Sequence, residues 1–175
     1  MNQTNPVKSK FLLALLLMVA AAITRFIPHA SNFTAVGAMA LFGGAIFRDK
    51  RIAFLLPLIV MLATDAVLGF HVSMIPVYAC FAATVFVGTR ISYRLNPFSI
   101  VASSIACSIL FFLITNLPFW YADLSLYPLT WNGTIESYTA AIPFFGNLLA
   151  GDLFYNTVLF GTYFLVSRRL TTLAA

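Results

Sequence analysis

Charged side chains are scarce in this chain of 175 residues. Only 9% of the residues are Asp, Glu, Lys or Arg, whereas 61% are hydrophobic, and the mean hydropathy is +0.95. One soluble core of this size cannot bury so much apolar surface, so the composition excludes a soluble globular protein and indicates a membrane protein. A membrane span takes about 20 residues, so several spans would use most of the chain and leave one membrane domain, residues 1–175.

The sequence also lacks the motifs of several enzyme classes. It contains no Walker A motif, no dinucleotide-binding glycine pattern and no HExxH, and therefore shows no recognised means of hydrolysing ATP. Its two cysteines and two histidines match no standard zinc spacing, and we expect no disulfide. Although the pI is about 9.5, the basic residues stand in short connections beside apolar runs, so we expect no nucleic-acid partner.

What the chain does contain is a series of six long apolar segments. The first follows Lys8 and Lys10 as in a signal peptide, but no small-residue cleavage site precedes a soluble region, so we expect a retained helix. The pattern predicts an all-α, six-helix transmembrane bundle. The expected helices lie at about residues 9–27, 34–47, 52–70, 72–90, 98–117 and 139–166.

The basic residues are distributed on one side of this predicted bundle. Nine of the ten Lys and Arg residues fall where the termini and the even-to-odd connections share one face, and the positive-inside rule makes that face cytoplasmic. Both termini are then cytoplasmic, and Arg25 is the single Lys or Arg expected outside. We expect a multi-pass protein of a cytoplasmic membrane. The nine residues are Lys8, Lys10, Arg48, Lys50, Arg51, Arg90, Arg94, Arg168 and Arg169.

Small residues predict close helix packing at three places. The segment 34–47 has little side-chain bulk, so neighbouring backbones can approach it closely. Pairs of small residues four positions apart favour such approaches in lipid, where apolar burial supplies no driving force between helices. The pairs are Ala40 with Gly44, Ala102 with Ala106, and Gly146 with Ala150.

One long connection, residues 118–138, is rich in aromatic side chains and is expected outside. It is either an interfacial aromatic belt or a lid over an outward-facing cavity, since loops longer than about 12 to 15 residues are usually functional or disordered. Its aromatic residues are Phe119, Trp120, Tyr121, Tyr127, Trp131 and Tyr138.

Ionisable residues and a thiol are the candidate functional groups within the spans. Asp65 and Asp152 are functional candidates because charges inside a membrane are costly, although each can instead have a structural partner. Cys80 lies about 12 Å below the outer end of its helix, on one face with Pro76 and Thr84, as the floor of a pocket would. The alternative is that Cys80 packs as a small hydrophobe, as we expect for Cys107.

Several segments resemble those of known membrane proteins. They are similar to the small six-span substrate-binding subunits, called S-components, of bacterial energy-coupling-factor transporters. Within that group the chain most resembles the solitary S-components of the BtuM type, which bind cobalamin. The segments are RFIPH at 25–29, NFT at 32–34, GAMALFGGA at 37–45 and LGFH at 68–71, together with Pro57, Asp65 and PVYAC at 76–80.

The resemblance implies uptake of cobalamin or a related corrinoid from outside, as a transported ligand rather than an intrinsic cofactor. In this type a cysteine of the fourth helix binds the corrin cobalt, and Cys80 matches that position. A thiolate is a soft ligand that suits late transition metals, so Cys80 is the expected cobalt ligand. Displacement of a cyanide ligand would then assist reductive decyanation, which would add a catalytic role to Cys80.

A corrinoid pocket also needs polar groups and a cover. Trp120, Tyr121 and Trp131 are expected to cover the ligand, and Arg25 and His29 lie near the outer face. The residues expected to contact ring amides or the nucleotide tail are Asn32, Asp65, His71, Tyr78, Asn147, Asp152 and Tyr155.

Other functions remain open at this point. The same fold can carry another vitamin or precursor, with Cys80 in a packing role. An intramembrane enzyme with Cys80 as nucleophile lacks a general base within one helical turn, and a structural membrane subunit would bind no solute. S-components that share an ATPase module have a pair of small residues on the first helix, whereas here Met18 follows Ala14 by four positions. The solitary type implies transport without a dedicated module.

Overall fold

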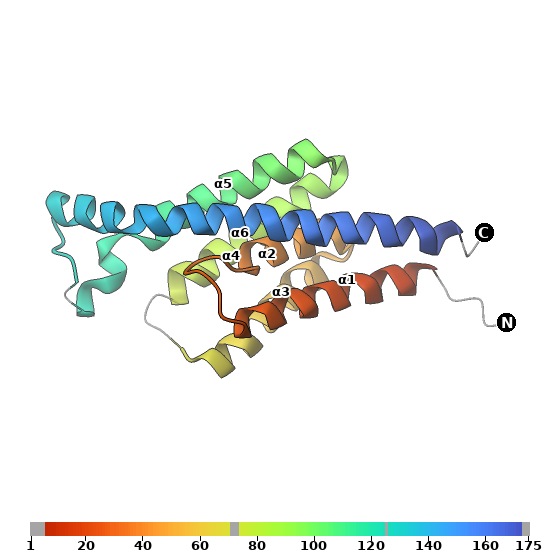
Figure 1. The fold of residues 1–175 in the computed structure, drawn as a ribbon, viewed down its shortest axis with the longest axis horizontal. Coiled ribbons are helices and arrows are strands. Elements are labelled where there is room, and N and C mark those ends of the chain that lie inside the picture. The colour runs from red at the N-terminus through yellow and green to blue at the C-terminus, as the bar shows by residue number, and fades with distance from the viewer. Residues whose placement is uncertain (1–5, 71–73, 125, 173–175) are drawn as a thin grey trace.

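The computed structural model describes residues 6–70, 74–124 and 126–172, and these residues form a bundle of helices without strands (Figure 1). The prediction of an all-α membrane bundle is confirmed. Its six α-helices are α1 (Pro6–Ile23), α2 (Val36–Ile46), α3 (Lys50–Leu68), α4 (Met74–Ile91), α5 (Pro97–Thr115) and α6 (Trp131–Thr172). Three short 3₁₀ helices connect them: η1 (Thr24–Phe26), η2 (Ser92–Arg94) and η3 (Pro118–Leu124).

Five of the helices, α1, α3, α4, α5 and α6, are long and apolar enough to cross a membrane. Their outer faces carry large apolar side chains such as Leu55, Ile59 and Val67, which are 58%, 58% and 73% exposed in the isolated chain. Lipid is the solvent that such faces require. The protein is therefore a membrane protein.

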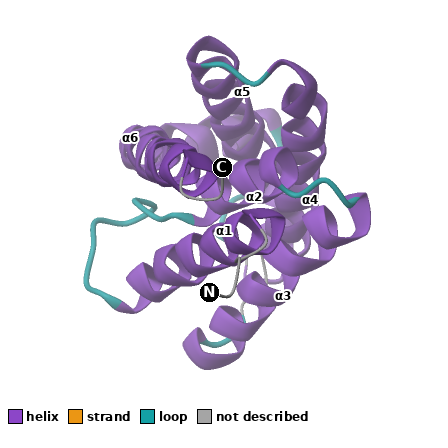
Figure 2. Cartoon of the chain, turned by 90° about the vertical axis from the view of Figure 1, so that its right-hand side faces the viewer, coloured by secondary structure: helices purple, strands orange, loops and turns teal. Residues whose placement is uncertain are grey.

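Helix α2 has 11 residues, or about 16 Å of helix, which is too short to cross about 30 Å of hydrocarbon. It contacts each of the other five α-helices and lies among them in Figure 2. Every residue from 38 to 45 is buried. A helix with so little side-chain bulk can occupy the centre of the bundle because its neighbours reach its backbone.

The closest approach is between α2 and α4. A Cβ atom added to Gly44 would overlap the Val85 carbonyl, and one added to Gly88 would overlap the Leu41 carbonyl. The two backbones therefore touch, as the Ala40 and Gly44 pair predicts.

The other two pairs of small residues do not pack in this way. Ala102, Ala106 and Ala150 are exposed on the bundle surface, and no atom lies within 4 Å of a Cβ placed on Gly146. The close contact of α6 is instead at Gly151, where an added Cβ would lie 3.1 Å from the Thr34 amide nitrogen. Spacing alone marks the positions where close packing is allowed, whereas the arrangement of neighbouring helices selects the position that is used.

The largest difference from the sequence prediction concerns α6, which begins at Trp131 rather than near residue 139. The expected lid loop 118–138 is therefore shorter, because η3 and the first two turns of α6 occupy most of it. Thr130 Oγ1 accepts a hydrogen bond from the Gly133 amide, and Ser137 donates to the Asn116 carbonyl at the end of α5. Polar residues at the start of α6 interrupt the apolar pattern without interrupting the helix.

The end of α6 differs from the prediction by six residues and the ends of the other helices by no more than four, and local caps account for two of the starts. The Asp49 side chain accepts from the Arg51 and Ile52 amides at the start of α3. Asn96 and Ser99 form a capping box at the start of α5. Both ends of the described chain lie at the same end of the bundle (Figure 1), so the short α2 and the segment before it return the chain to that end between α1 and α3.

Candidate functional site

A cavity of about 390 Å³ lies in the half of the bundle opposite the termini. Residues of η1, of α2 to α6 and of the connections at that end line it. Five phenylalanines form apolar walls, and a smaller number of polar groups lie between them. The phenylalanines are Phe81, Phe111, Phe112, Phe144 and Phe145, and the polar groups include Arg25, Asn32, Asp65, Thr84, Asn116 and Asp152.

The short α2 explains why space exists here. The helix starts only at Val36, and Val36 and Gly37 line the cavity where a longer helix would fill it. Asn32, with φ of 64°, turns the preceding segment, and the side-chain amide of Asn147 in α6 donates to the Ser31 carbonyl at 3.1 Å. The segment is thereby held against α6 beside the cavity.

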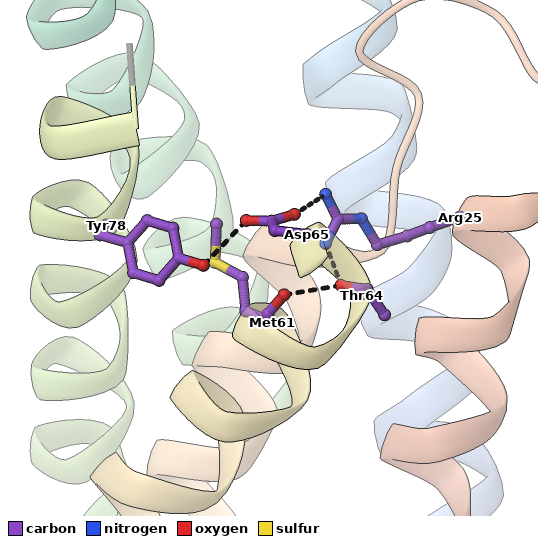
Figure 3. A network of polar contacts seen from close by, with 5 residues as sticks. All are labelled: Arg25, Met61, Thr64, Asp65 and Tyr78. Atoms are coloured by element: carbon purple, nitrogen blue, oxygen red, sulfur yellow. Dashed lines mark hydrogen bonds and ion pairs between the residues drawn. The ribbon is translucent and has the colours of Figure 1, made fainter. Parts of the chain in front are cut away.

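Arg25 and Asp65 form an ion pair at the edge of the cavity, with 2.7 Å between Nη2 and Oδ1 (Figure 3). A second guanidinium nitrogen of Arg25 donates to the Thr64 hydroxyl, which itself donates to the Met61 carbonyl at 2.8 Å. The hydroxyl of Tyr78 donates to Asp65 Oδ2 at 2.9 Å.

This network joins η1 to α3 and α4 and leaves both carboxylate oxygens of Asp65 with a partner. The side chains of Arg25 and Asp65 are only 14% and 4% exposed. A buried ion pair is tolerated when geometry and additional hydrogen bonds offset the loss of solvation. The pair therefore adds polarity to the cavity without adding net charge.

Asp152 lies at the other side of the cavity, on α6 and against the first turn of α2. A Cβ on Gly37 would overlap its carboxylate, and the backbone amide of Ala38 lies close to it. Ser108 of α5 donates to Oδ2 at 2.6 Å, whereas Oδ1 has no hydrogen-bond partner among the described residues. A helix N-terminus stabilises negative charge, so this position suits a carboxylate.

Cys80 is buried but is not among the residues that line the cavity. Helix α4 presents Val77, Phe81 and Thr84 to the cavity, and Cys80 is turned about 100° around the helix axis from its neighbour Phe81. The thiol that lines the cavity is that of Cys107 on α5, which the sequence analysis assigned to packing. The expected stripe of Pro76, Cys80 and Thr84 thus has only Thr84 at the cavity.

Only one of the three aromatic residues expected to cover the ligand lines the cavity. Tyr121 lines the cavity, and its hydroxyl donates to the Thr115 carbonyl at 2.9 Å. Trp120 donates from Nε1 to the Ile114 carbonyl at 2.7 Å and holds η3 against the end of α5. Trp131 is 77% exposed at the start of α6 and does not line the cavity.

Of the other expected contacts, Arg25, Asn32, Asp65 and Asp152 line the cavity. Tyr78 and Asn147 support it from outside its lining, through Asp65 and Ser31. Tyr155 packs on the Phe33 ring, with 5.9 Å between ring centroids, and His29 is exposed beside the Ile27 carbonyl. His71 lies outside the described residues.

The apolar pattern of the sequence did not predict the phenylalanine walls. Phe112 and Phe145, from α5 and α6, have ring centroids 4.8 Å apart and face the cavity together. In an apolar membrane helix, a phenylalanine that faces lipid and one that faces a cavity have the same local pattern, so only the helix arrangement distinguishes them.

Among known proteins, one family model matches almost the whole chain. The model of a family described as a family of unknown function (DUF6580) matches residues 5–173. Neither the curated proteins nor the solved structures contain a match to the chain. The match includes every residue of the cavity but assigns no chemistry to it, and the resemblance to solitary S-components stays a prediction.

Proposed function

The chain belongs to this DUF6580 family of unknown function, and from its cavity we propose that it binds a small solute from outside and carries it across a bacterial cytoplasmic membrane. The observation that supports the proposal is the cavity of about 390 Å³ with aromatic walls and a few buried polar groups. Small-molecule sites are usually concave, mostly apolar and about 300–1,000 Å³ in volume.

The charge distribution supports the direction of uptake. The basic residues at the two termini and in the connections from α2 to α3 and from α4 to α5 mark the end opposite the cavity. Since such residues are retained on the cytoplasmic side of membranes, the cavity end faces outward. A solute would then enter between η1, η3 and the first half of α6.

The size of the cavity favours a solute smaller than a corrinoid. A volume near the lower end of the range for drug-sized ligands suits a solute smaller than a corrin ring with its nucleotide tail. Cys80 also lies outside the lining. Both observations favour the alternative predicted from the sequence, in which a similar fold takes another vitamin or precursor and Cys80 packs between helices.

Corrinoid uptake is a second candidate, and one observation favours it: a thiol does line the cavity. Cys107 belongs to the lining, and a thiolate is a suitable ligand for cobalt. In this form of the proposal Cys107, rather than Cys80, binds the metal of the incoming solute, and the cavity widens to admit the ring.

Equilibrium binding to the protein in lipid nanodiscs tests the proposal, with cyanocobalamin and a panel of smaller vitamins and precursors as solutes. We expect saturable binding of a smaller solute. Phe112→Trp should weaken it at least about fivefold, because overfilling a packed site costs about 1–3 kcal/mol. Phe98→Trp is the matched control, since Phe98 is 81% exposed.

Two outcomes would count against parts of this proposal. Absence of saturable binding to any solute by folded protein would favour a structural subunit. For the corrinoid form, the absorption spectrum of bound cyanocobalamin should change with the wild type and with Cys80→Ala but not with Cys107→Ala. An unchanged spectrum with the wild type would exclude a bond between cobalt and either thiol.

A further inference from the structure

The charges that line the cavity do not cancel. Among the described lining residues, Arg25, Asp65 and Asp152 are the charged ones. Arg25 and Asp65 neutralise each other at 2.7 Å, and both oxygens of Asp65 are occupied. One carboxylate, that of Asp152, therefore remains without a cationic partner in a low-dielectric site.

The described residues provide a hydrogen-bond partner for only one of the two oxygens of this carboxylate. Oδ2 accepts from Ser108, and the N-terminus of α2 supplies a partial positive charge of about half a unit. Oδ1 has no hydrogen-bond partner among the described residues, although Asp152 is only 4% exposed. A buried polar atom without a partner costs free energy, about 1–3 kcal/mol and more for a charged group. Asp152 belongs to the cavity lining, so a donor on a ligand can supply the hydrogen bond that Oδ1 lacks once the carboxylate turns from Gly37 toward the cavity.

The walls around Asp152 indicate what kind of donor fits. Phe111, Phe112, Phe144 and Phe145 line the same cavity, and aromatic faces attract organic cations through their quadrupoles. The available volume of about 390 Å³ is far larger than a bare metal ion needs. A positively charged group on an organic body meets both the carboxylate and the rings.

We propose that Asp152 is the charge-recognition residue of the cavity and that the solute is a small organic ammonium ion, which donates an N–H hydrogen bond to Oδ1 while its apolar part packs on the phenylalanines. This inference rests on the proposed function and names the chemical class of its solute. The Arg25 and Asp65 pair has no charge to spare for the ligand and serves to close the edge of the cavity.

The test uses three probes of nearly equal size that differ in charge at neutral pH: benzylammonium, benzyl alcohol and benzoate. The measurement is the concentration dependence of the unfolding temperature of the protein in nanodiscs. We expect benzylammonium to bind at least about tenfold more tightly than benzyl alcohol, and benzoate to bind least. Asp152→Asn should remove the difference between the ammonium and the alcohol. Glu136→Gln is the matched control and should keep it, because Glu136 is an exposed acid of α6 that does not line the cavity.

The outcomes separate this inference from the proposed function. Equal affinity for benzylammonium and benzyl alcohol would overturn charge recognition but leave a small-molecule cavity. Failure of all three probes to bind would contradict both. If sodium chloride gave the same Asp152-dependent stabilisation as benzylammonium, the site would hold an inorganic cation and the proposal would be wrong. If Asp152→Asn does not fold, the affinities of the wild-type protein for the three probes decide whether the cavity recognises positive charge.

Discussion

Asp65 and Asp152 represent two ways of placing a carboxylate inside a membrane bundle. Asp65 has Arg25 and Tyr78 as partners, whereas Asp152 has a hydroxyl, a helix N-terminus and one oxygen without a hydrogen-bond partner in the described part of the chain. The first arrangement is complete without a ligand and connects three elements. The second is incomplete, and this difference leads us to assign stability to Asp65 and recognition to Asp152.

The role of Asp65 is open to direct measurement. Asp65→Asn should lower the free energy of unfolding by about 3–5 kcal/mol, because it leaves the buried Arg25 without a counter-charge. Glu136→Gln is the control: Glu136 is exposed on α6, so the change should stay within about 0.5 kcal/mol. Denaturant unfolding in mixed micelles measures both. Equal stability of the two variants would contradict a structural role for the ion pair.

Among the elements, α2 determines the architecture. It is too short to span the membrane and is surrounded by all five longer helices, so its surroundings are protein rather than lipid. Its first turn forms the wall of the cavity beside Asp152, and its later residues contact the backbone of α4. The same shortness therefore produces both the cavity and the tight crossing beneath it.

The crossing of α2 and α4 predicts the effect of a side chain at Gly88. Gly88→Val should destabilise the protein by at least about 2 kcal/mol, since the new Cβ would overlap the backbone of α2 at Leu41. The matched control is Gly161→Val in α6, where no atom lies within 4 Å of an added Cβ. Thermal unfolding in nanodiscs compares the two. A tolerated Gly88→Val would show that the helices do not pack as closely as described.

At the scale of the whole molecule, the bundle is asymmetric along its axis. The basic residues and the termini lie at one end, and the cavity, the Arg25 network and η3 lie at the other. Helix α6 is 42 residues long, or about 63 Å, so it extends well beyond the thickness of a bilayer. The start of α6 and η3 therefore form a polar and aromatic rim around the cavity end.

This asymmetry predicts which residues are accessible in intact cells. With Cys80 and Cys107 replaced by Ala, Leu129→Cys at the cavity end should react with a membrane-impermeant maleimide in intact cells. Tyr93→Cys at the opposite end should react only after the cells are opened. Both positions are well exposed, at 63% and 77%, so burial does not explain a difference. Labelling in the reverse order would invert the proposed direction of uptake.

The sequence by itself determined the class of protein, the existence of the helices and the distribution of charge. These are local properties: an apolar run of about 20 residues is compelled to cross the membrane wherever its neighbours lie, and Lys and Arg report the side on which a connection remains. The extension of α6 was missed because its first turns are polar and are held by contacts with the end of α5.

Only the tertiary structure decided which side chains meet. Arg25, Asp65 and Tyr78 were predicted separately, and the fold joined them into one network. The rotation of α4 placed Phe81 rather than Cys80 at the cavity, and the position of α5 brought Cys107 there instead. Such contacts depend on the relative rotation of helices far apart in the sequence, which packing of all six helices sets together and no local pattern records.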